Sequence, residues 1–148
     1  MPKQPRSLKT RAIDYLSRRE HSRRELERKL MPHASCQQEI SILLDELAEL
    51  GLQSDERFAH SLLNRRGNRY GWQRIAHELR QHGVAESLID QLQGDLIETE
   101  YDRAEQVWKK KYDAPPRDTK EYARQYRFMT SRGFGSEAVR RLLGDLPS

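Results

Sequence analysis

Basic side chains are the groups in this sequence whose number and spacing best suit binding chemistry. The stretch YLSRREHSRRELERKL, residues 15–30, holds six basic residues and three glutamates in sixteen positions. A guanidinium presents a rigid fork of N–H donors that matches phosphate and carboxylate oxygens. The stretch could therefore contact an acidic partner. It could equally be the solvated face of a helix, in which Glu25 and Lys29 form an ordinary i,i+4 ion pair.

Residue patterns for catalysis or metal binding are weak by comparison. His33 and Cys36 are the nearest pair at metal-ligand spacing, and no second pair accompanies them. The chain has no Gly-x-x-x-x-Gly-Lys phosphate loop, and Gly133-Phe134-Gly135 is better explained as a turn between helices than as a phosphate cradle. The sequence predicts a binding protein that is not an enzyme and that uses no cofactor or metal.

The charge of the chain alternates in blocks, although the net charge is only +4. Residues 1–34, 57–84 and 107–148 carry net charges of +6, +5 and +5, whereas residues 35–56 and 85–106 each carry −6. A solvated face has no need to repeat in sign. Three basic blocks at regular intervals therefore make a contact surface about as good an explanation as a solvated face, while the acidic segments could simply pair with basic neighbours in the fold.

We take the basic residues of these blocks as candidate contacts with a protein or nucleic-acid partner. Two neighbouring aromatic residues, Tyr70 and Trp72, could stack on bases. The candidate contact residues are Arg18, Arg19, Arg23, Arg24, Arg28, Lys29, Arg65, Arg66, Arg69, Arg74, Lys109, Lys110, Lys111, Arg124, Arg127, Arg140 and Arg141.

The composition favours helices. Leucine occurs 18 times, whereas valine, isoleucine and threonine together occur 13 times, and β-branched residues are those that prefer strands. Ser22 with Glu25 and Ser35 with Gln38 predict capping boxes at helix starts. Left-handed helix ends are predicted at Gly51, Gly83 and Gly133. We predict nine helices, over residues 8–19, 22–31, 36–50, 55–69, 72–82, 85–98, 100–112, 118–131 and 136–145.

These helices fall into three sets of three. Apolar positions of the first set match those of the second at an offset of 49, as in Leu26 and Ile75, and the second matches the third at an offset of 50, as in Leu79 and Met129. A fixed period of this size is typical of stacked repeats. We predict an all-α protein, an elongated tandem array of three three-helix repeats over residues 1–52, 53–98 and 99–148.

Two absences in the sequence bear on location. The single Cys36 excludes an intramolecular disulfide and suits a reducing compartment. The basic N-terminal segment is followed by no apolar stretch of a secretory signal, and no run approaches the ~18 apolar residues of a membrane span. We predict a monomeric, cytoplasmic protein that does not bind membranes.

The most distinctive stretches resemble a known family. YLSRREHSRRELERKL, LDELAELGLQSDERFAHSLLNRR and YGWQRIAHELRQHGV resemble the RecX family of regulators of RecA-type recombinases, over about residues 11–96. TSRGFGSEAVRRLL extends the resemblance toward the end of the chain with weaker matches. Trp72 stands where the family often has proline after the glycine, and a first-turn proline is easily replaced.

The resemblance implies a function. It implies a modular, all-helical, cytoplasmic protein of DNA recombination, repair and the SOS response that modulates, and mainly inhibits, the recombinase. Members are thought to lie in the groove of the recombinase–DNA filament, and some contact DNA. The family offers no catalytic residue and no sharply defined contact motif. A direct DNA-binding module is the alternative, because a three-helix unit can present a helix with Arg65, Arg66, Arg69 and Arg74 to the major groove; a purely structural scaffold is the third possibility.

Overall fold

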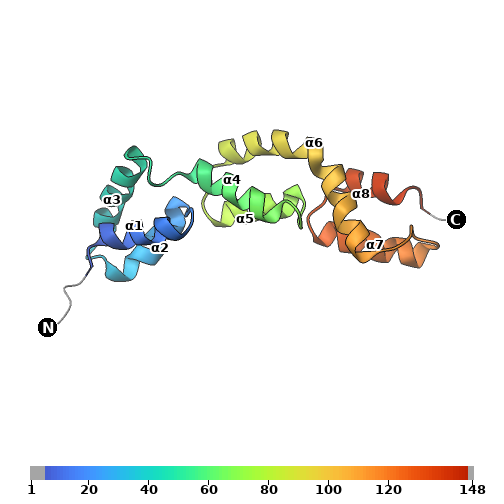
Figure 1. The fold of residues 1–148 in the computed structure, drawn as a ribbon, viewed down its shortest axis with the longest axis horizontal. Coiled ribbons are helices and arrows are strands. Elements are labelled where there is room, and N and C mark those ends of the chain that lie inside the picture. The colour runs from blue at the N-terminus through green and yellow to red at the C-terminus, as the bar shows by residue number, and fades with distance from the viewer. Residues whose placement is uncertain (1–5, 147–148) are drawn as a thin grey trace. The chain divides into compact units, whose positions relative to one another are not determined.

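The structure is a computed structural model that describes residues 6–146, and the all-helical prediction is confirmed for them. They form eight α-helices and one 3₁₀ turn, with no strand (Figure 1). The helices are α1 (Leu8–Arg18), α2 (Arg23–Leu30), α3 (Gln37–Glu49), α4 (Asp55–Arg66), α5 (Trp72–Gln81), α6 (Glu86–Lys111), α7 (Thr119–Ser131) and α8 (Ser136–Leu143), and the 3₁₀ turn is η1 (Met31–His33).

The prediction of two helices over residues 85–98 and 100–112 is wrong, because α6 runs without a break through both. No proline stands between them, and Thr99, a residue type that often caps a helix start, does not interrupt the helix. Thr99 is accommodated inside the helix, where its hydroxyl donates to the carbonyl of Leu96 at 3.2 Å. The predicted repeat boundaries stay a prediction, and residues on both sides of the boundary at 98 belong to this one helix.

One of the two predicted capping boxes forms, and the predicted glycine helix ends are present. The capping box of Ser22 and Glu25 is confirmed at the start of α2. The box of Ser35 and Gln38 does not form, because α3 begins one residue later, after Cys36. The carboxylate of Glu39 instead accepts the backbone N–H of Ser35 at 2.9 Å. The left-handed ends are confirmed, with positive φ at Gly51, Gly83 and Gly133.

The described residues form two compact units, and α4 begins in the first and ends in the second. The first unit, residues 6–61 with 82–84, contains α1, α2 and α3 packed against one another. Their apolar stripes meet in one core, against which Leu8, Tyr15, Leu16 and Ala34 are partly buried. The core residues are Ala12, Leu26, Leu30, Ile40, Leu43, Leu44 and Leu47.

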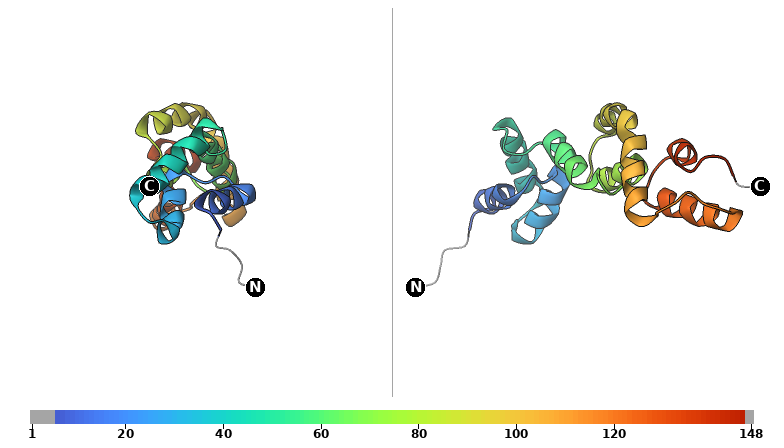
Figure 2. Two further views of the ribbon diagram at one scale, coloured as in Figure 1. Left: turned by 90° about the vertical axis from the view of Figure 1, so that its left-hand side faces the viewer. Right: turned by 45° about the vertical axis from the view of Figure 1, so that its right-hand side comes forward.

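The second unit, residues 62–81 with 85–146, is organised along the long helix α6. Helix α5 packs against α6, and α8 packs against both α6 and α7, as the views of Figure 2 show. The core beside the second half of α6 consists of Ala104, Val107, Met129, Phe134, Val139 and Leu143. Trp72 at the start of α5 is also buried, with 7% of its surface exposed.

Candidate partner-binding site

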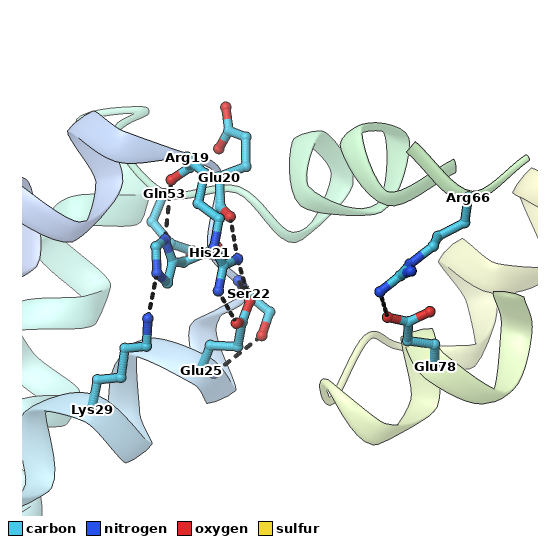
Figure 3. Close-up of polar contacts among 9 residues, drawn as sticks. All are labelled: Arg19, Glu20, His21, Ser22, Glu25, Lys29, Gln53, Arg66 and Glu78. Atoms are coloured by element: carbon cyan, nitrogen blue, oxygen red, sulfur yellow. Dashed lines mark hydrogen bonds and ion pairs between the residues drawn. The ribbon is translucent and has the colours of Figure 1, made fainter. Parts of the chain in front are cut away.

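Several basic residues of the opening stretch hold the first unit together internally. Arg19 directly follows α1, and its guanidinium donates to the carboxylate of Glu25 at 2.7 Å and to the carbonyl of Glu20 at 2.9 Å (Figure 3). Arg23, at the start of α2, pairs with Asp45 of α3 at 2.8 Å. These two candidate contact residues therefore fix the α1–α2 turn and the α2–α3 packing.

The turn between α1 and α2 also buries a histidine. The ring of His21 is almost fully buried and lies between two partners, the ammonium of Lys29 at 3.0 Å from Nε2 and the carbonyl of Arg19 at 3.0 Å from Nδ1. A protonated lysine can only donate, so Nε2 is the acceptor and Nδ1–H donates to the carbonyl. The candidate contact Lys29 is exposed, yet its ammonium thus has an intramolecular partner, and it lies 4.9 Å from the centre of the Tyr15 ring.

The pKa values of this turn follow from its contacts. Burial lowers the pKa of His21, and the nearby charges of Arg19 and Lys29 lower it further. Burial opposes ionisation of Glu25, but hydrogen bonds from Arg19 and from the backbone of Ser22 outweigh burial and leave its pKa below the ordinary value. The folded turn therefore requires a neutral His21 and an ionised Glu25.

We predict that acid destabilises the first unit through His21. An unfolded histidine has a pKa of about 6.5, above that of folded His21. The unfolded chain thus binds more protons below about pH 6.5, so stability is fully present above that value and falls as the pH is lowered through it. Thermal unfolding followed by circular dichroism should show this between about pH 8 and about pH 5.

The matched control for this prediction is His60→Gln, since His60 is exposed. The variant His21→Gln should have a flatter pH dependence than the unsubstituted chain, and His60→Gln should keep it. Loss of the Glu25 contribution belongs to a separate window, below about pH 4.5. Equal slopes for His21→Gln and the unsubstituted chain across the higher window would contradict the prediction.

Two basic residues of the opening stretch, Arg24 and Arg28, are available to a partner. Arg24 and Arg28 are exposed and form no ion pair with any residue from 6 to 146. They line a shallow hollow together with Glu27, Met31 and Pro32. The carboxylate of Glu27 accepts a hydrogen bond from the Gln37 amide at 2.7 Å. It forms no ion pair with Arg24 or Arg28.

In the second unit, three arginines gather around one aromatic ring. The Cζ atoms of Arg74, Arg132 and Arg66 lie 4.0, 5.5 and 5.9 Å from the centre of the half-buried Tyr70 ring. Among residues 6–146, only Arg66 of these three has a carboxylate partner, Glu78 at 3.4 Å (Figure 3). The Nε atom of Arg66 is buried and has no hydrogen-bond partner within the same range. We call these three arginines and Tyr70 the Tyr70 cluster.

A second ring continues the Tyr70 cluster. The Cζ atom of Arg132 also lies 5.2 Å from the centre of the Phe128 ring, and the ammonium of Lys111 lies 4.0 Å from the same centre. Lys111 is exposed and ends α6, whereas Phe128 lies in the last turns of α7. Cations from α6 and from the α7–α8 turn are therefore held against aromatic rings, each by an attraction of about 0.5–2 kcal/mol.

Backbone contacts bring the two halves of the Tyr70 cluster together. The N–H of Gly71 donates to the carbonyl of Arg132 at 2.8 Å, and the N–H of Gln73 donates to the carbonyl of Gly133 at 3.2 Å. A Cβ atom at Gly71 would lie 2.4 Å from the carbonyl oxygen of Gly133. The α4–α5 turn and the α7–α8 turn can approach this closely only because Gly71 has no side chain.

Arg103 of α6 fixes the same region from the other side. Its guanidinium donates to the carbonyls of Gly67 and Tyr70, both at 3.1 Å, and to that of Leu96 at 3.2 Å. Burial lowers its pKa, which still leaves an arginine charged. Arg103 is therefore a structural cation that holds the α4–α5 turn.

The other candidate contact residues lie in varied settings. Arg18 pairs with Asp14 at 3.2 Å and Lys109 with Glu105 at 2.7 Å, both within one helix, and the guanidinium of Arg127 donates to the carbonyl of Ala123 at 3.4 Å. Arg141 lies over the Tyr101 ring at 4.0 Å. Exposed and without an ion pair among the described residues are Arg65, Arg69, Lys110, Arg124 and Arg140.

Sequence reasoning missed Arg132, Phe128 and Arg103. A signal for the first two was available, because Phe128 lies in the last turns of α7 and Arg132, four residues later, is the C-cap of that helix. The suggestion that Trp72 stacks on bases is wrong, because that side chain is buried. Whether the candidate residues contact a partner stays a prediction.

Residues 6–146 contain neither a metal-binding cluster nor a membrane-spanning helix. No three His, Cys, Asp or Glu side chains there lie close enough to hold a metal ion. None of the helices in that range is both long enough and apolar enough to cross a bilayer. The turn before α8 faces a carboxylate already, since an oxygen of Glu100 would lie 3.6 Å from a Cβ atom at Gly135, which disfavours a phosphate there.

Comparison with protein families identifies three matching segments. The family models described as the first, second and third three-helix domains of RecX match residues 9–33, 54–92 and 98–143. Among curated proteins, "Regulatory protein RecX" of Ralstonia pickettii is 46% identical over 97% of this chain and 90% of the relative. That of Herbaspirillum seropedicae is 48% identical over 95% and 91%, and that of Pseudomonas entomophila is 42% identical over 94% and 91%.

Solved structures give the same fold. The crystal structure of a regulatory protein RecX superposes with a TM-score of 0.76 at 23% identity, covering 92% of this chain and 70% of that one. The RecX structure from Lactobacillus salivarius gives a TM-score of 0.76 at 19% identity, covering 91% of each chain. At such identities the likeness establishes the all-helical fold of three-helix domains and nothing about the partner.

Proposed function

We propose, because this chain belongs to the RecX family of regulatory proteins, that it modulates a RecA-type recombinase and mainly inhibits it by binding in the groove of the recombinase–DNA filament. Family membership across all three domains is the observation that carries the proposal. The chain acts as a monomer in the cytoplasm, and it acts by occupying the filament rather than by catalysis.

The distribution of free cations supports this proposal. Both units carry basic side chains without an ion pair to any described residue: Arg24 and Arg28 in the first, and Arg74 and Lys111 among others in the second. Weak contacts from several domains on one chain add up through their effective concentration. A groove occupied in this way excludes an incoming duplex, so strand exchange stops without any chemical step.

The test is a strand-exchange and ATP-hydrolysis assay on preformed filaments of the cognate recombinase. The chain should reduce both activities at less than one molecule per recombinase subunit, because each bound molecule contacts several subunits. The double variant Arg24→Glu, Arg28→Glu should require a several-fold higher concentration for the same inhibition. Arg23 is left unchanged, since a carboxylate there would face Asp45.

The matched control is the double variant Arg117→Glu, Lys120→Glu, which reverses two exposed charges elsewhere. Both double variants should keep their helix content, since exposed substitutions usually cost within about 0.5 kcal/mol each. If the full chain leaves both activities unchanged at every concentration, inhibition of the filament is wrong. If the Arg24, Arg28 variant inhibits as well as the control, this surface of the first unit is not a contact.

A direct DNA-binding module is the second candidate function, and the exposed arginines before α5 are the observation that favours it. Arg65 and Arg69 are exposed and precede α5 closely in the sequence, and a helix-turn-helix module would place that helix in the major groove. The two functions differ in what they require. A DNA-binding module binds bare duplex at nanomolar concentration in physiological salt, whereas a filament modulator needs the recombinase.

A further inference from the structure

We propose that the Tyr70 cluster, extended by Phe128 and Lys111, binds the phosphodiester backbone of a single nucleic-acid strand. This inference goes beyond the proposed function, because it assigns a site for a ligand that the chain would bind in the absence of a recombinase. It also differs from a helix placed in the major groove, because the proposed site lies at two turns and reads the backbone rather than base edges.

The first argument is the charge balance of the site. Arg66, Arg74 and Arg132 bring three positive charges to one ring, and a single carboxylate of the described residues, Glu78, pairs with one of them. The nearby carboxylate of Glu100 accepts the backbone N–H of Trp72 at 3.0 Å and pairs with none of the three. Neighbouring positive charges repel one another, and an anion bound among them would reduce this repulsion.

The second argument is that the cluster is held in place. The guanidinium of Arg103 donates to the carbonyl of Tyr70, which fixes the backbone of that residue. The backbone N–H of Gly71 donates to the carbonyl of Arg132 and fixes that residue in the same way. Aromatic rings then hold the guanidinium of Arg74 and the ammonium of Lys111, each 4.0 Å from a ring centre. Cations that are held before a ligand arrives lose less conformational entropy on binding than free surface side chains do.

The third argument concerns the kind of anion. A guanidinium has five donors in one plane, of which a bidentate contact to a phosphate uses two. Arg74 is exposed and Arg132 and Tyr70 are half-buried, so the cluster is open to a long ligand rather than enclosed around a small one. Stacked guanidiniums and aromatic rings suit unpaired bases, which a duplex keeps inside its stack. A single strand therefore fits better than a duplex.

The experiment is fluorescence anisotropy of a labelled mixed-sequence single-stranded oligonucleotide, titrated with the full chain at low and at physiological salt. Arg74→Gln and Arg132→Gln should each weaken binding roughly tenfold at low salt, as expected for loss of a charge-assisted contact. Each should also flatten the salt dependence, because fewer counterions are released. The control Arg117→Gln removes the same charge from an exposed loop and should change affinity by less than about twofold.

The variant Tyr70→Leu separates a built site from a merely basic surface, because it leaves every charge in place. It should weaken binding by roughly fivefold, whereas Tyr70→Phe should bind as the unsubstituted chain does. Circular dichroism of each variant checks that the chain is folded. A duplex of the same sequence should bind more weakly, and inorganic phosphate at equal phosphate concentration should not displace the strand.

Four results would overturn the proposal: unchanged affinity in both arginine variants, unchanged affinity in a folded Tyr70→Leu, tighter binding of the duplex, or displacement by inorganic phosphate. None of these measurements contains a recombinase. Their failure would therefore leave the proposed inhibition of the filament untouched, and failure of the strand-exchange assay would leave this site untouched.

Discussion

Replacing Gly71 by alanine should lower the free energy of unfolding of the second unit by about 3 kcal/mol, the upper range for an overpacked site. The added Cβ atom would lie 2.4 Å from the carbonyl oxygen of Gly133 and 2.5 Å from the Cα atom of Phe134. Both are backbone atoms, which cannot rotate away as a side chain can. The two turns must separate, and the hydrogen bonds from Gly71 and Gln73 across them are lost.

Chemical denaturation followed by circular dichroism measures this effect, and Gly94→Ala is its control. Gly94 lies inside α6, and apart from the neighbouring helix backbone no atom of residues 6–146 lies within 4 Å of an added Cβ, so alanine there should stabilise the chain by about 1 kcal/mol through helix propensity. The two substitutions are chemically identical and have opposite expected signs. A Gly71→Ala variant as stable as the unsubstituted chain would mean that the close approach of the two turns is not a feature of the folded protein.

The second large effect is expected at Arg103. Arg103→Met keeps the length of the side chain but removes the donors that serve the carbonyls of Gly67, Tyr70 and Leu96. Loss of hydrogen bonds to a charged group and the unpaired carbonyls left behind should reduce the free energy of unfolding by about 2–3 kcal/mol. Denaturant unfolding gives the value directly.

Two comparisons make the Arg103 result interpretable. Arg103→Lys keeps the charge but cannot span three carbonyls with one planar group, so it should recover only part of the loss. Arg117→Met removes an exposed arginine and should change stability little. Full recovery by lysine would show that charge alone matters at this position and that the fork of donors does not.

The local sequence pattern was enough to predict most helices of this chain, but not whether two neighbouring helical segments are separate or continuous. The helix start at Ser22 and the left-handed ends at Gly51, Gly83 and Gly133 depend on neighbouring residues only, and were predictable. The continuity of α6 was not, because its apolar stripe is weak where the expected break lay and nothing local decides whether a helix stops there. That choice is made by packing against α5 and α8.

The candidate site was predictable at the level of residue type and not at the level of role. Arg19, Arg23 and Arg24 are similar in sequence context, yet Arg19 pairs with Glu25 and Arg23 with Asp45, while Arg24 has no ion pair among the described residues. Asp45 belongs to another helix, so the local pattern does not decide which arginine is paired. For the same reason Arg132 joins Tyr70, 62 positions away in the chain, through a contact between two turns that no local pattern encodes.

Because α6 is one unbroken helix, it fixes the distance between its two ends within the second unit. At 1.5 Å per residue, its 26 residues span about 39 Å. The segments matched by the second and third family models share this one helix. The parts of them that lie on α6 are therefore spaced and oriented by a rigid helix rather than by a flexible linker. A ligand held at one end meets the other end at a fixed distance and rotation, without the entropy loss that ordering a tether would require.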